Sequence, residues 1–449
     1  MTSTRELLSV IDSRKAQVGV IGLGYAGVAV AASLAGAGFR VLGVEKRAER
    51  VKMLSAGECP IGGVEPSLAE LLARVTGSGK LTATTDVSVL RAADVVLIDV
   101  ETPVESDHRP HFLALRAACD DLGRVMKPGT LVIVESTVAP GTTMSVVAPL
   151  LEARSGLALN TGFFLGHCPE PVMPGKLLSN LRALSRACGG ATPETANAMV
   201  AFYRSIVDGE LCATDCITAE LTKTAENTFR DVNIAFANEL ALICQSVGAD
   251  FSRVRQLVNK SPGRNMLVAG AGVGGHCLPK DPWLLAHRVP AENVSLIAAA
   301  RARNDSMPLH TARLVLDALA EAGKGMSGAR IAVLGYAYLE NAADARNSPS
   351  QALIAHLEEW GADVCVHDTY VPGYGGELWT AIRGADAVVV MTAHAEYTGI
   401  DLARVRRELR TPVIVDGRHV IEPGAARDAG LVFRGIGRGV GRGDRTGPT

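Results

Sequence analysis

The sequence predicts an α/β protein in which two Rossmann-like doubly wound domains are joined by a central helical region. A strand, a glycine-rich turn, a helix and a second strand follow one another near the N-terminus, and further apolar strands alternate with helical segments. Two long helical patterns come next, after which the strand–helix alternation restarts. A chain of 449 residues is also too long for one ordinary domain. We therefore expect domains over 1–207, 208–323 and 324–433, followed by a disordered tail over 434–449.

Composition and charge limit the classes of partner. Apolar residues make up 47% of the chain and the formal net charge is −2, as in a globular protein with an ample core. Near-neutral charge disfavours nucleic acid or a membrane surface as the main partner, and no apolar run is long enough to span a membrane. The polar start of the chain does not read as a signal peptide. Nine cysteines without Cys-x-x-Cys pairs predict neither a disulfide framework nor a metal site, so we expect a reduced, cytoplasmic protein.

The first strand and helix carry a dinucleotide fingerprint. Glycines at 22, 24 and 27 lie between the strand ending at Ile21 and an apolar helix. The next strand is predicted over 40–44, and Glu45 follows it, 18 residues past Gly27. Such glycines let the backbone approach a pyrophosphate at the helix N-terminus. Glu45 would accept hydrogen bonds from ribose hydroxyls and repel a 2′-phosphate, which favours NAD over NADP. The cofactor-binding residues predicted at this turn are Gly22, Gly24, Tyr25, Ala26, Gly27 and Glu45.

Polar residues follow the next strands of the predicted parallel sheet. The strands at 94–100 and 131–135 lead into loops that contain Thr102 and Thr137. Because ligands lie at the carboxyl ends of strands in such sheets, we expect both threonines to face the cofactor or the substrate. The alternative is that each hydroxyl caps the following turn. Glu170 is the only carboxylate in a proline-rich loop further along, where it is either functional or simply solvated.

The two long helical patterns span about 215–247 and 294–322. Lys223 and Asn227 are four residues apart on the first helix and therefore share a face. A lysine beside an amide can stabilise an oxyanion, although a solvated polar stripe is the other interpretation. A long helical pair between two α/β regions often forms a dimer interface, so we expect a homodimer.

A glycine-rich loop between these helices leads into Cys277, and Asp281 follows four residues later. Closely spaced glycines permit unusual backbone dihedrals and close approach of a ligand. A thiolate held by such a loop is a candidate nucleophile, whereas the alternative is a buried structural cysteine. After residue 324 the second doubly wound domain lacks the glycine fingerprint, so we expect it to bind a different nucleotide group.

These motifs together resemble the UDP-glucose/GDP-mannose dehydrogenase family of NAD-dependent nucleotide-sugar 6-dehydrogenases. The resemblance extends from about residue 17 to 421, and the run 226–233 is most similar to the branch that oxidises UDP-N-acetylhexosamines. Besides the fingerprint, the matching motifs are Glu135-Ser136-Thr137-Val138, Cys168-Pro169-Glu170, Lys223-Thr224-Ala225-Glu226-Asn227, Gly274-Gly275-His276-Cys277 with Asp281, and Asp344-Ala345-Arg346-Asn347-Ser348-Pro349.

The resemblance implies four-electron oxidation of a sugar C6 hydroxyl to a carboxylate by two hydride transfers. Cys277 would trap the intermediate aldehyde as a thiohemiacetal, which becomes a thioester and is hydrolysed. Lys223 and Asn227 would stabilise the oxyanions, Asp281 would orient water or act as base, and Glu170 with Thr137 would assist hydrolysis. The C-terminal domain would hold the nucleoside diphosphate. The implied substrate-binding residues are Glu170, Lys223, Asn227, Asn265, Gly274 and Arg346.

Two positions depart from the family pattern. Pro171 stands where the family usually has arginine, and Leu339 stands where it usually has a substrate-holding lysine. The nucleotide and the sugar therefore stay open between UDP-glucose, a UDP-N-acetylhexosamine and a thymidine diphosphate sugar. A single-hydride hydroxyacid dehydrogenase and a non-enzymatic nucleotide-sugar sensor are the competing functions. The first would not need Cys277, and the second would bind without turnover.

Overall fold

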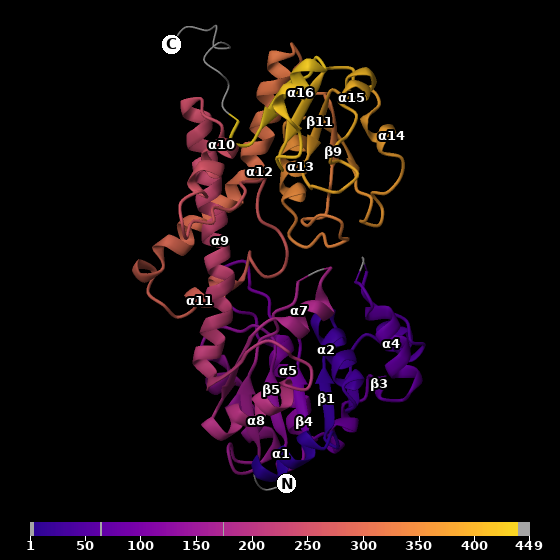
Figure 1. Ribbon diagram of the computed structural model, residues 1–449, viewed down its shortest axis with the longest axis vertical. Helices are drawn as coiled ribbons and strands as arrows, with labels where there is room; N and C mark the ends of the chain where they lie inside the picture. Colours follow the sequence, from indigo (N-terminus) through magenta and orange to yellow (C-terminus); the bar gives the residue numbers. More distant parts are fainter. Residues whose placement is uncertain (1–3, 63–64, 174, 439–449) are drawn as a thin grey trace. The chain divides into compact units, whose positions relative to one another are not determined.

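The computed structural model describes residues 4–62, 65–173 and 175–438, which form two compact units (Figure 1). Unit 1 comprises Met1–Glu226 with Trp283–Arg288, and unit 2 comprises Asn227–Pro282 with Val289–Thr449. The predicted central helical region forms no separate compact unit, because its residues are divided between these two. The two doubly wound α/β sheets expected from the sequence are confirmed, one in each unit.

Unit 1 contains an eight-stranded sheet with the order β3-β2-β1-β4-β5-β6-β7-β8. The first six strands have the strand order of a dinucleotide-binding Rossmann sheet and pair in parallel, whereas β6 and β7 pair antiparallel. The strands are β1 (Gln17–Ile21), β2 (Arg40–Val44), β3 (Leu81–Thr84), β4 (Val95–Ile98), β5 (Leu131–Val134), β6 (Phe164–His167), β7 (Arg186–Gly190) and β8 (Leu211–Asp215).

Helices cover both faces of this sheet, and each face has its own apolar core. Along β4, Val95 and Leu97 belong to one core, while Val96 and Ile98 belong to the other. This alternation explains why β4 is apolar at every position. The helical segments of unit 1 are α1 (Thr4–Asp12), α2 (Tyr25–Gly36), α3 (Ala48–Ser55), α4 (Leu68–Gly77), η1 (Val87–Ala92), α5 (Leu113–Gly123), η2 (Thr143–Val147), α6 (Ala148–Ser155), α7 (Leu177–Ala183), α8 (Pro193–Tyr203) and the start of α9 (Cys216–Val247).

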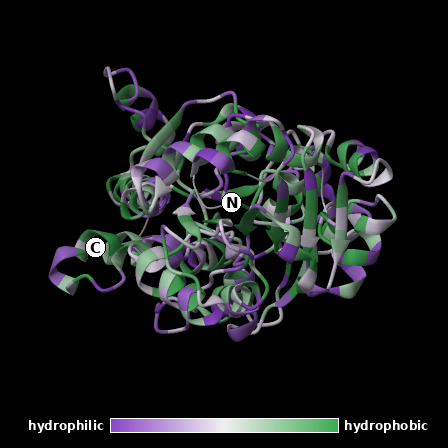
Figure 2. Cartoon of the chain, turned by 90° about the horizontal axis from the view of Figure 1, so that it is seen from below, coloured by the Kyte–Doolittle hydropathy of each residue, from purple (hydrophilic) through white to green (hydrophobic). Residues whose placement is uncertain are grey.

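Unit 2 contains a five-stranded parallel sheet with the order β10-β9-β11-β12-β13. Figure 2 shows hydrophilic residues concentrated on outer turns and loops. None of the described helices is both long and apolar enough to cross a membrane. The strands are β9 (Arg330–Leu334), β10 (Asp363–His367), β11 (Ala387–Val390), β12 (Val413–Asp416) and β13 (Val432–Gly435). The helices are the rest of α9, α10 (Phe251–Val258), α11 (Asp281–Ala286, which begins in this unit), η3 (Ala291–Asn293), α12 (Ser295–Glu321), α13 (Pro349–Glu359), α14 (Leu378–Ile382), α15 (Leu402–Glu408) and α16 (Pro423–Asp428).

The predicted disordered tail is wrong for residues 434–438. β13 extends to Gly435 and pairs with β12, and Ile436 is fully buried. Gly437 accepts a hydrogen bond from the Phe251 amide at 2.9 Å, and Arg438 forms an ion pair with Asp250. The repeated glycines and arginines do not have the apolar pattern of a strand. The end of the edge strand β13 and the buried Ile436 after it were therefore not predicted. The remaining tail, 439–449, lies outside the described residues.

A series of buried, hydrogen-bonded polar side chains joins α9 to α12 and extends to the glycine-rich loop. The guanidinium of Arg301 lies 2.6 Å from the Asp231 carboxylate, and both side chains are at most 2% exposed. Asn304 donates to Asp231 at 2.8 Å and accepts from Asn238 at 2.9 Å. The Asn238 side chain in turn accepts from the Gly270 amide at 2.9 Å. The helix pair therefore fixes the backbone at the start of the loop that carries Cys277.

Candidate active site

The three fingerprint glycines serve two different purposes. Gly22 has φ +94°, and a Cβ there would lie 2.4 Å from the Asp99 carbonyl oxygen. A Cβ on Gly27 would lie 2.0 Å from the Gly22 carbonyl oxygen. Both glycines are therefore required for strand–helix packing. At Gly24 the nearest protein atom to a Cβ would be an Arg50 nitrogen 4.0 Å away, so the protein itself does not require glycine there.

Gly24 is also the N-cap of α2, and no side chain caps this helix N-terminus. Backbone N–H groups and the helix dipole make such an end favourable for phosphate. The space beside Gly24 and the uncapped helix end together fit a dinucleotide pyrophosphate. Within the described residues, no group of three or more His, Cys, Asp or Glu side chains could hold a metal ion.

Glu45 lies beside the fingerprint, at the end of β2. It is 5% exposed and accepts hydrogen bonds from the amides of Leu23 at 3.1 Å and Arg47 at 3.0 Å. The Arg50 guanidinium lies 3.4 Å from the same carboxylate. Glu45 therefore ties the glycine turn to β2. Its carboxylate retains acceptor capacity for a ribose hydroxyl, because each oxygen has more than one lone pair.

Tyr25 acts as a tether for the first turn of α2. Its hydroxyl donates to Glu65, and the Glu65 carboxylate also accepts from the amides of Gly175 at 2.6 Å and Leu177 at 3.2 Å. Sequence reasoning missed Glu65, because it lies 40 residues from Tyr25 and 110 from Gly175 and matches no local motif. Ala26, also predicted to bind cofactor, lies in the first turn of α2.

Thr102 and Thr137 lie in the loops after β4 and β5, and one of these hydroxyls has a structural use. The Thr102 hydroxyl donates to the Thr137 carbonyl oxygen at 2.6 Å, which ties the two loops together. Thr102 is buried, whereas Thr137 is partly exposed. The geometry at Thr102 matches the alternative in which the hydroxyl bonds to backbone. Contact of either threonine with a cofactor stays a prediction.

Glu170 and Lys223 form the charged part of the site in unit 1. One Glu170 oxygen accepts from the Val172 amide at 2.5 Å, and the Lys223 side chain is 11% exposed. Burial raises the pKa of Glu170 to about 7, although Lys223, the Val172 amide and Arg186 each oppose the rise. The carboxyl group of a solvated loop acid would not have its pKa raised by burial. A carboxyl group that ionises near neutral pH is suited to general base catalysis.

Asn227 and Asp281 are brought together in unit 2. The Asn227 amide nitrogen donates to one Asp281 oxygen at 2.5 Å, and the Lys280 ammonium lies 2.5 Å from the other. The Asp281 side chain is fully buried and Lys280 is 7% exposed. The carboxylate thus orients an amide and an ammonium group. Sequence reasoning missed Lys280, since an adjacent lysine has no spacing that distinguishes it from a surface charge.

Cys277 is exposed, which contradicts the alternative of a buried structural cysteine. The preceding glycines are required because Tyr338 packs against them. A Cβ would lie 2.5 Å from the Tyr338 Cβ at Gly274, and 2.8 Å from the Tyr338 ring at Gly275. The Gly275 amide donates to the Arg346 carbonyl oxygen at 2.8 Å. The loop after β9 therefore fixes the backbone at Gly275, two residues before Cys277.

Two predicted substrate residues in unit 2 are exposed to solvent. Asn265 lies in the loop after α10, and the Arg346 side chain is 50% exposed and forms a bidentate pair with Asp344. Asp344 raises the pKa of Arg346. Ligand contact by Asn265, Gly274 and Arg346 stays a prediction.

Arg418 is a further cation beside the glycine loop. It lies just after β12 and donates to the Met391 carbonyl oxygen at 2.6 Å. A Cβ on Gly270 would lie 2.8 Å from its guanidinium. Burial lowers the pKa of Arg418, although the charges of Glu340 and Asp416 oppose this change. The Asp416 carboxylate also accepts a hydrogen bond from the Arg418 backbone amide at 2.8 Å. Arg418 lies at the carboxyl end of a parallel strand, and this position was the feature of the sequence that could have indicated a ligand-binding role.

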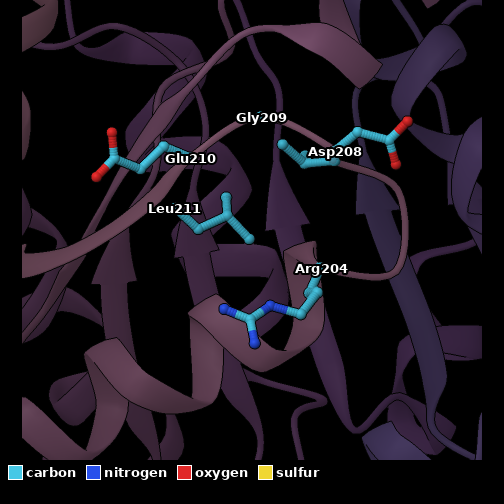
Figure 3. Close-up of a pocket in the computed structure, with 6 residues that line it drawn as sticks. Arg204, Asp208, Gly209, Glu210 and Leu211 are labelled. Carbon is cyan, nitrogen blue, oxygen red and sulfur yellow. The ribbon is translucent and has the colours of Figure 1, made fainter.

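A cavity of about 490 Å³ lies elsewhere in unit 1 and contains none of the predicted site residues (Figure 3). Asp208 in its wall forms an ion pair with Arg182 at 2.6 Å. Neither the fingerprint nor any of the catalytic candidates contributes to it. The lining residues are Arg204, Val207, Asp208, Gly209, Glu210 and Leu211.

Comparison with known proteins matches the chain over nearly its whole length. Three domain models of the UDP-glucose/GDP-mannose dehydrogenase family match in order: the NAD binding domain over 16–207, the central domain over 217–306 and the UDP binding domain over 332–423. A UDP-N-acetyl-D-mannosamine dehydrogenase of Pyrococcus horikoshii is 40% identical, with 94% of this chain and 99% of the relative covered.

Two solved structures are similar over the same extent. That of the UDP-D-ManNAc dehydrogenase from Pyrococcus horikoshii has a TM-score of 0.90 at 39% identity, covering 94% of this chain and 99% of the other. An NDP-N-acetyl-D-galactosaminuronic acid dehydrogenase from Methanosarcina mazei has a TM-score of 0.84 at 37% identity, covering 98% of each chain. Neither comparison favours a single-hydride hydroxyacid dehydrogenase.

Proposed function

The chain belongs to the UDP-glucose/GDP-mannose dehydrogenase family of NAD-dependent nucleotide-sugar dehydrogenases, and we propose that it oxidises the C6 hydroxyl of a UDP-N-acetylhexosamine to the carboxylate. UDP-N-acetylmannosamine is the first candidate. The observation that carries this choice is the 40% identity to a UDP-N-acetyl-D-mannosamine dehydrogenase over 94% of the chain. The exposed thiol of Cys277 in the glycine loop supports the four-electron reaction.

NAD fits the residues of unit 1 and supplies the hydride acceptor when bound. Its pyrophosphate would lie against Gly24 and the uncapped N-terminus of α2, and its ribose would donate to Glu45. Gly22 and Gly27 hold the turn in the required shape. A 2′-phosphate would bring negative charge to the buried Glu45 carboxylate, so NADP is disfavoured.

The roles that we propose for the catalytic side chains are those that the family resemblance implies. The Cys277 thiolate attacks the aldehyde carbon and forms a C–S bond, and Lys223 and Asn227 stabilise the resulting oxyanion, each such donor being worth about 3 kcal/mol. Loss of a hydride from this adduct to NAD would leave a thioester, just as loss of the first hydride from the C6 alcohol would leave the aldehyde. Glu170 takes a proton from the attacking water, which Thr137 positions. The C–S bond then breaks and Cys277 leaves as the thiolate.

The diphosphate of the substrate needs a cation that Leu339 does not provide. We assign this role to Arg418, whose guanidinium lies beside Gly270 and donates to the Met391 carbonyl oxygen, while the Asp416 carboxylate accepts from the Arg418 backbone amide. Arginine suits a phosphate because its planar donors bind two oxygens at once. Asn265, Gly274 and Arg346 would complete contacts to the sugar and phosphates.

The deciding experiment measures NADH formed per molecule of sugar. We expect two NADH per UDP-N-acetylmannosamine, and lower kcat/KM with UDP-glucose, UDP-N-acetylglucosamine and thymidine diphosphate glucose. A yield of one NADH per sugar would indicate single-hydride chemistry. A clear preference for the thymidine compound would overturn the assignment of the nucleotide.

We also propose that the enzyme is a cytoplasmic homodimer. The nine cysteines, all within the described residues, are free thiols, which is typical of a protein in a reducing compartment. One face of α9 exposes several large apolar side chains, including Phe229 at 72% and Phe236 at 59%, with Ile243 and Val247 further along the helix. A second copy of the helix would cover this face. Phe229→Arg should give a monomer in light scattering, and a dimer that persists would exclude this interface.

A further inference from the structure

A buried glutamate on α9 has no place in the proposed catalytic steps. Glu220 lies three residues before Lys223 and is 1% exposed. Its two oxygens accept hydrogen bonds from two backbone amides, that of Thr143 at 2.7 Å and that of Gly141 at 2.5 Å. Burying a carboxylate is costly unless hydrogen-bond donors satisfy it, and here both donors belong to one short stretch of backbone in unit 1.

The two amides lie where a loop becomes a helix. Gly141 has φ +86°, and η2 begins two residues later at Thr143. The first N–H groups of a helix have no partner within it, and the side chain of the N-cap residue Thr142 makes no capping hydrogen bond to η2. Glu220 therefore caps this helix from α9, and a carboxylate is favourable at a helix N-terminus. The two bonds join α9 to a segment 77 and 79 residues earlier in the chain.

The loop that these bonds hold carries Thr137. The Thr102 hydroxyl donates to the Thr137 carbonyl oxygen at 2.6 Å, which fixes the start of the loop. Further along, the hydroxyl and the amide of Thr142 both donate to the Ala139 carbonyl oxygen, at 2.5 and 3.1 Å. Glu220 fixes the end of the loop. Thr137 is partly exposed while the residues on either side of it are buried.

We propose that Glu220 is a positioning residue for thioester hydrolysis, which attaches the loop over 136–143 to α9 and so fixes the Thr137 hydroxyl that orients the attacking water. The inference rests on the role proposed for Thr137. Residues three apart on a helix are neighbours on its surface, so the loop is attached to α9 within one turn of Lys223. Glu220 does not touch the reacting atoms and takes no part in proton transfer.

Loss of this attachment should slow one step of the reaction. Glu220→Gln keeps the size of the side chain but replaces one accepting oxygen with an NH₂ group, which cannot accept from a backbone amide. The loop is then released at the end held by Glu220, while Thr102 still holds its start. Lys223 stays on α9, so both hydride transfers should keep their rates. Misplacing an orienting group by about 1 Å costs on the order of a hundredfold in rate, so hydrolysis should slow by about tenfold or more.

The test is a double-mutant cycle in the full-length enzyme, with single turnovers of UDP-N-acetylmannosamine at saturating NAD. NADH absorbance follows the two hydride transfers, and mass spectrometry of acid-quenched samples measures the thioester on Cys277. Glu220→Gln should form two NADH at the wild-type rate, accumulate the thioester and release the acid about tenfold more slowly. Thr137→Ala should slow the same step. The double variant should be no slower than the slower single variant, because both changes remove the same function.

Three results would overturn the proposal. The first is that the two rate losses multiply in the double variant, since independent sites are additive in free energy. The others are wild-type thioester hydrolysis by a folded Glu220→Gln enzyme, or by Thr137→Ala. Failure of the proposed function would instead appear as one NADH per sugar in the wild type.

Asp94→Asn is the matched control for loss of a buried carboxylate. Asp94 is also buried in unit 1 and accepts from the Gln17 amide at 2.8 Å, but it lies at the amino end of β4, away from the edge where ligands bind. Its replacement should lower the melting temperature and leave thioester hydrolysis at the wild-type rate. Hydrolysis slowed as much as in Glu220→Gln would attribute the effect to general destabilisation and overturn the proposal.

Gly141→Ala perturbs the same loop without changing Glu220, and it serves if Glu220→Gln does not fold. A Cβ on Gly141 would meet no atom within 4 Å, so the substitution acts only through the backbone, which has φ +86° there. It should slow hydrolysis of the thioester while both NADH form at the wild-type rate. Wild-type hydrolysis by this variant would count against the proposal.

Discussion

Arg301→Met offers a quantitative test of the buried polar chain between α9 and α12. The Arg301 and Asp231 side chains are 2% and 0% exposed, and their charged atoms lie 2.6 Å apart. Removing the guanidinium leaves a buried carboxylate with Asn304 as its remaining side-chain donor. Breaking a buried pair in this way costs about 3–5 kcal/mol. Urea unfolding followed by fluorescence of Trp360 and Trp379, both in unit 2, would measure the loss.

The pH dependence of that loss provides a second check. Burial raises the pKa of Asp231 even with Arg301 present, and loss of Arg301 must raise it further. The folded state then binds a proton more tightly than the unfolded state, so stability falls as pH rises from the unfolded pKa toward the folded one. We expect a larger loss at pH 8 than at pH 5. The double variant Asp231→Leu/Arg301→Met should recover most of the free energy of unfolding that Arg301→Met loses. A loss below about 1 kcal/mol at pH 8 would refute the argument.

The other predictions concern the thiol and the fingerprint. Cys277→Ala should abolish formation of the acid while NAD still binds in a fluorescence titration, because only the covalent adduct requires sulfur; full turnover would exclude the thioester. Gly22→Ala should lower both melting temperature and NAD affinity, since its Cβ would lie 2.4 Å from the Asp99 carbonyl oxygen. Gly24→Ala should melt like the wild type yet bind NAD at least tenfold more weakly, because the open space there is predicted to hold the pyrophosphate. Unchanged NAD affinity in Gly24→Ala would move the cofactor elsewhere.

Local patterns were sufficient to predict most of the fold. β2 begins and ends at the predicted residues, and α9 and α12 each lie within one residue of their predicted ends. The apolar runs and glycine turns specify these elements without long-range information. β7 and β8 were not predicted, because Arg186-Ala-Cys-Gly-Gly has no apolar run and β7 pairs antiparallel with β6 through residues distant in sequence.

The candidate site was predictable as a set of residue types but not as a set of pairings. Asn227 and Asp281 were both chosen from the sequence, yet their hydrogen bond joins residues 54 positions apart. Likewise, Thr102 was chosen for a ligand, whereas its hydroxyl is used to tie two loops together.

The ordered segment after β13 determines where the chain can be shortened. Ending the protein at residue 438 would keep Ile436 in the core and preserve the ion pair between Arg438 and Asp250. Ending it at 433 would remove half of an edge strand and leave the outer side of β12 partly uncovered, which is the kind of exposed edge that promotes aggregation. We therefore expect a protein that ends at residue 438 to keep the fold of unit 2, and one that ends at 433 to aggregate more readily.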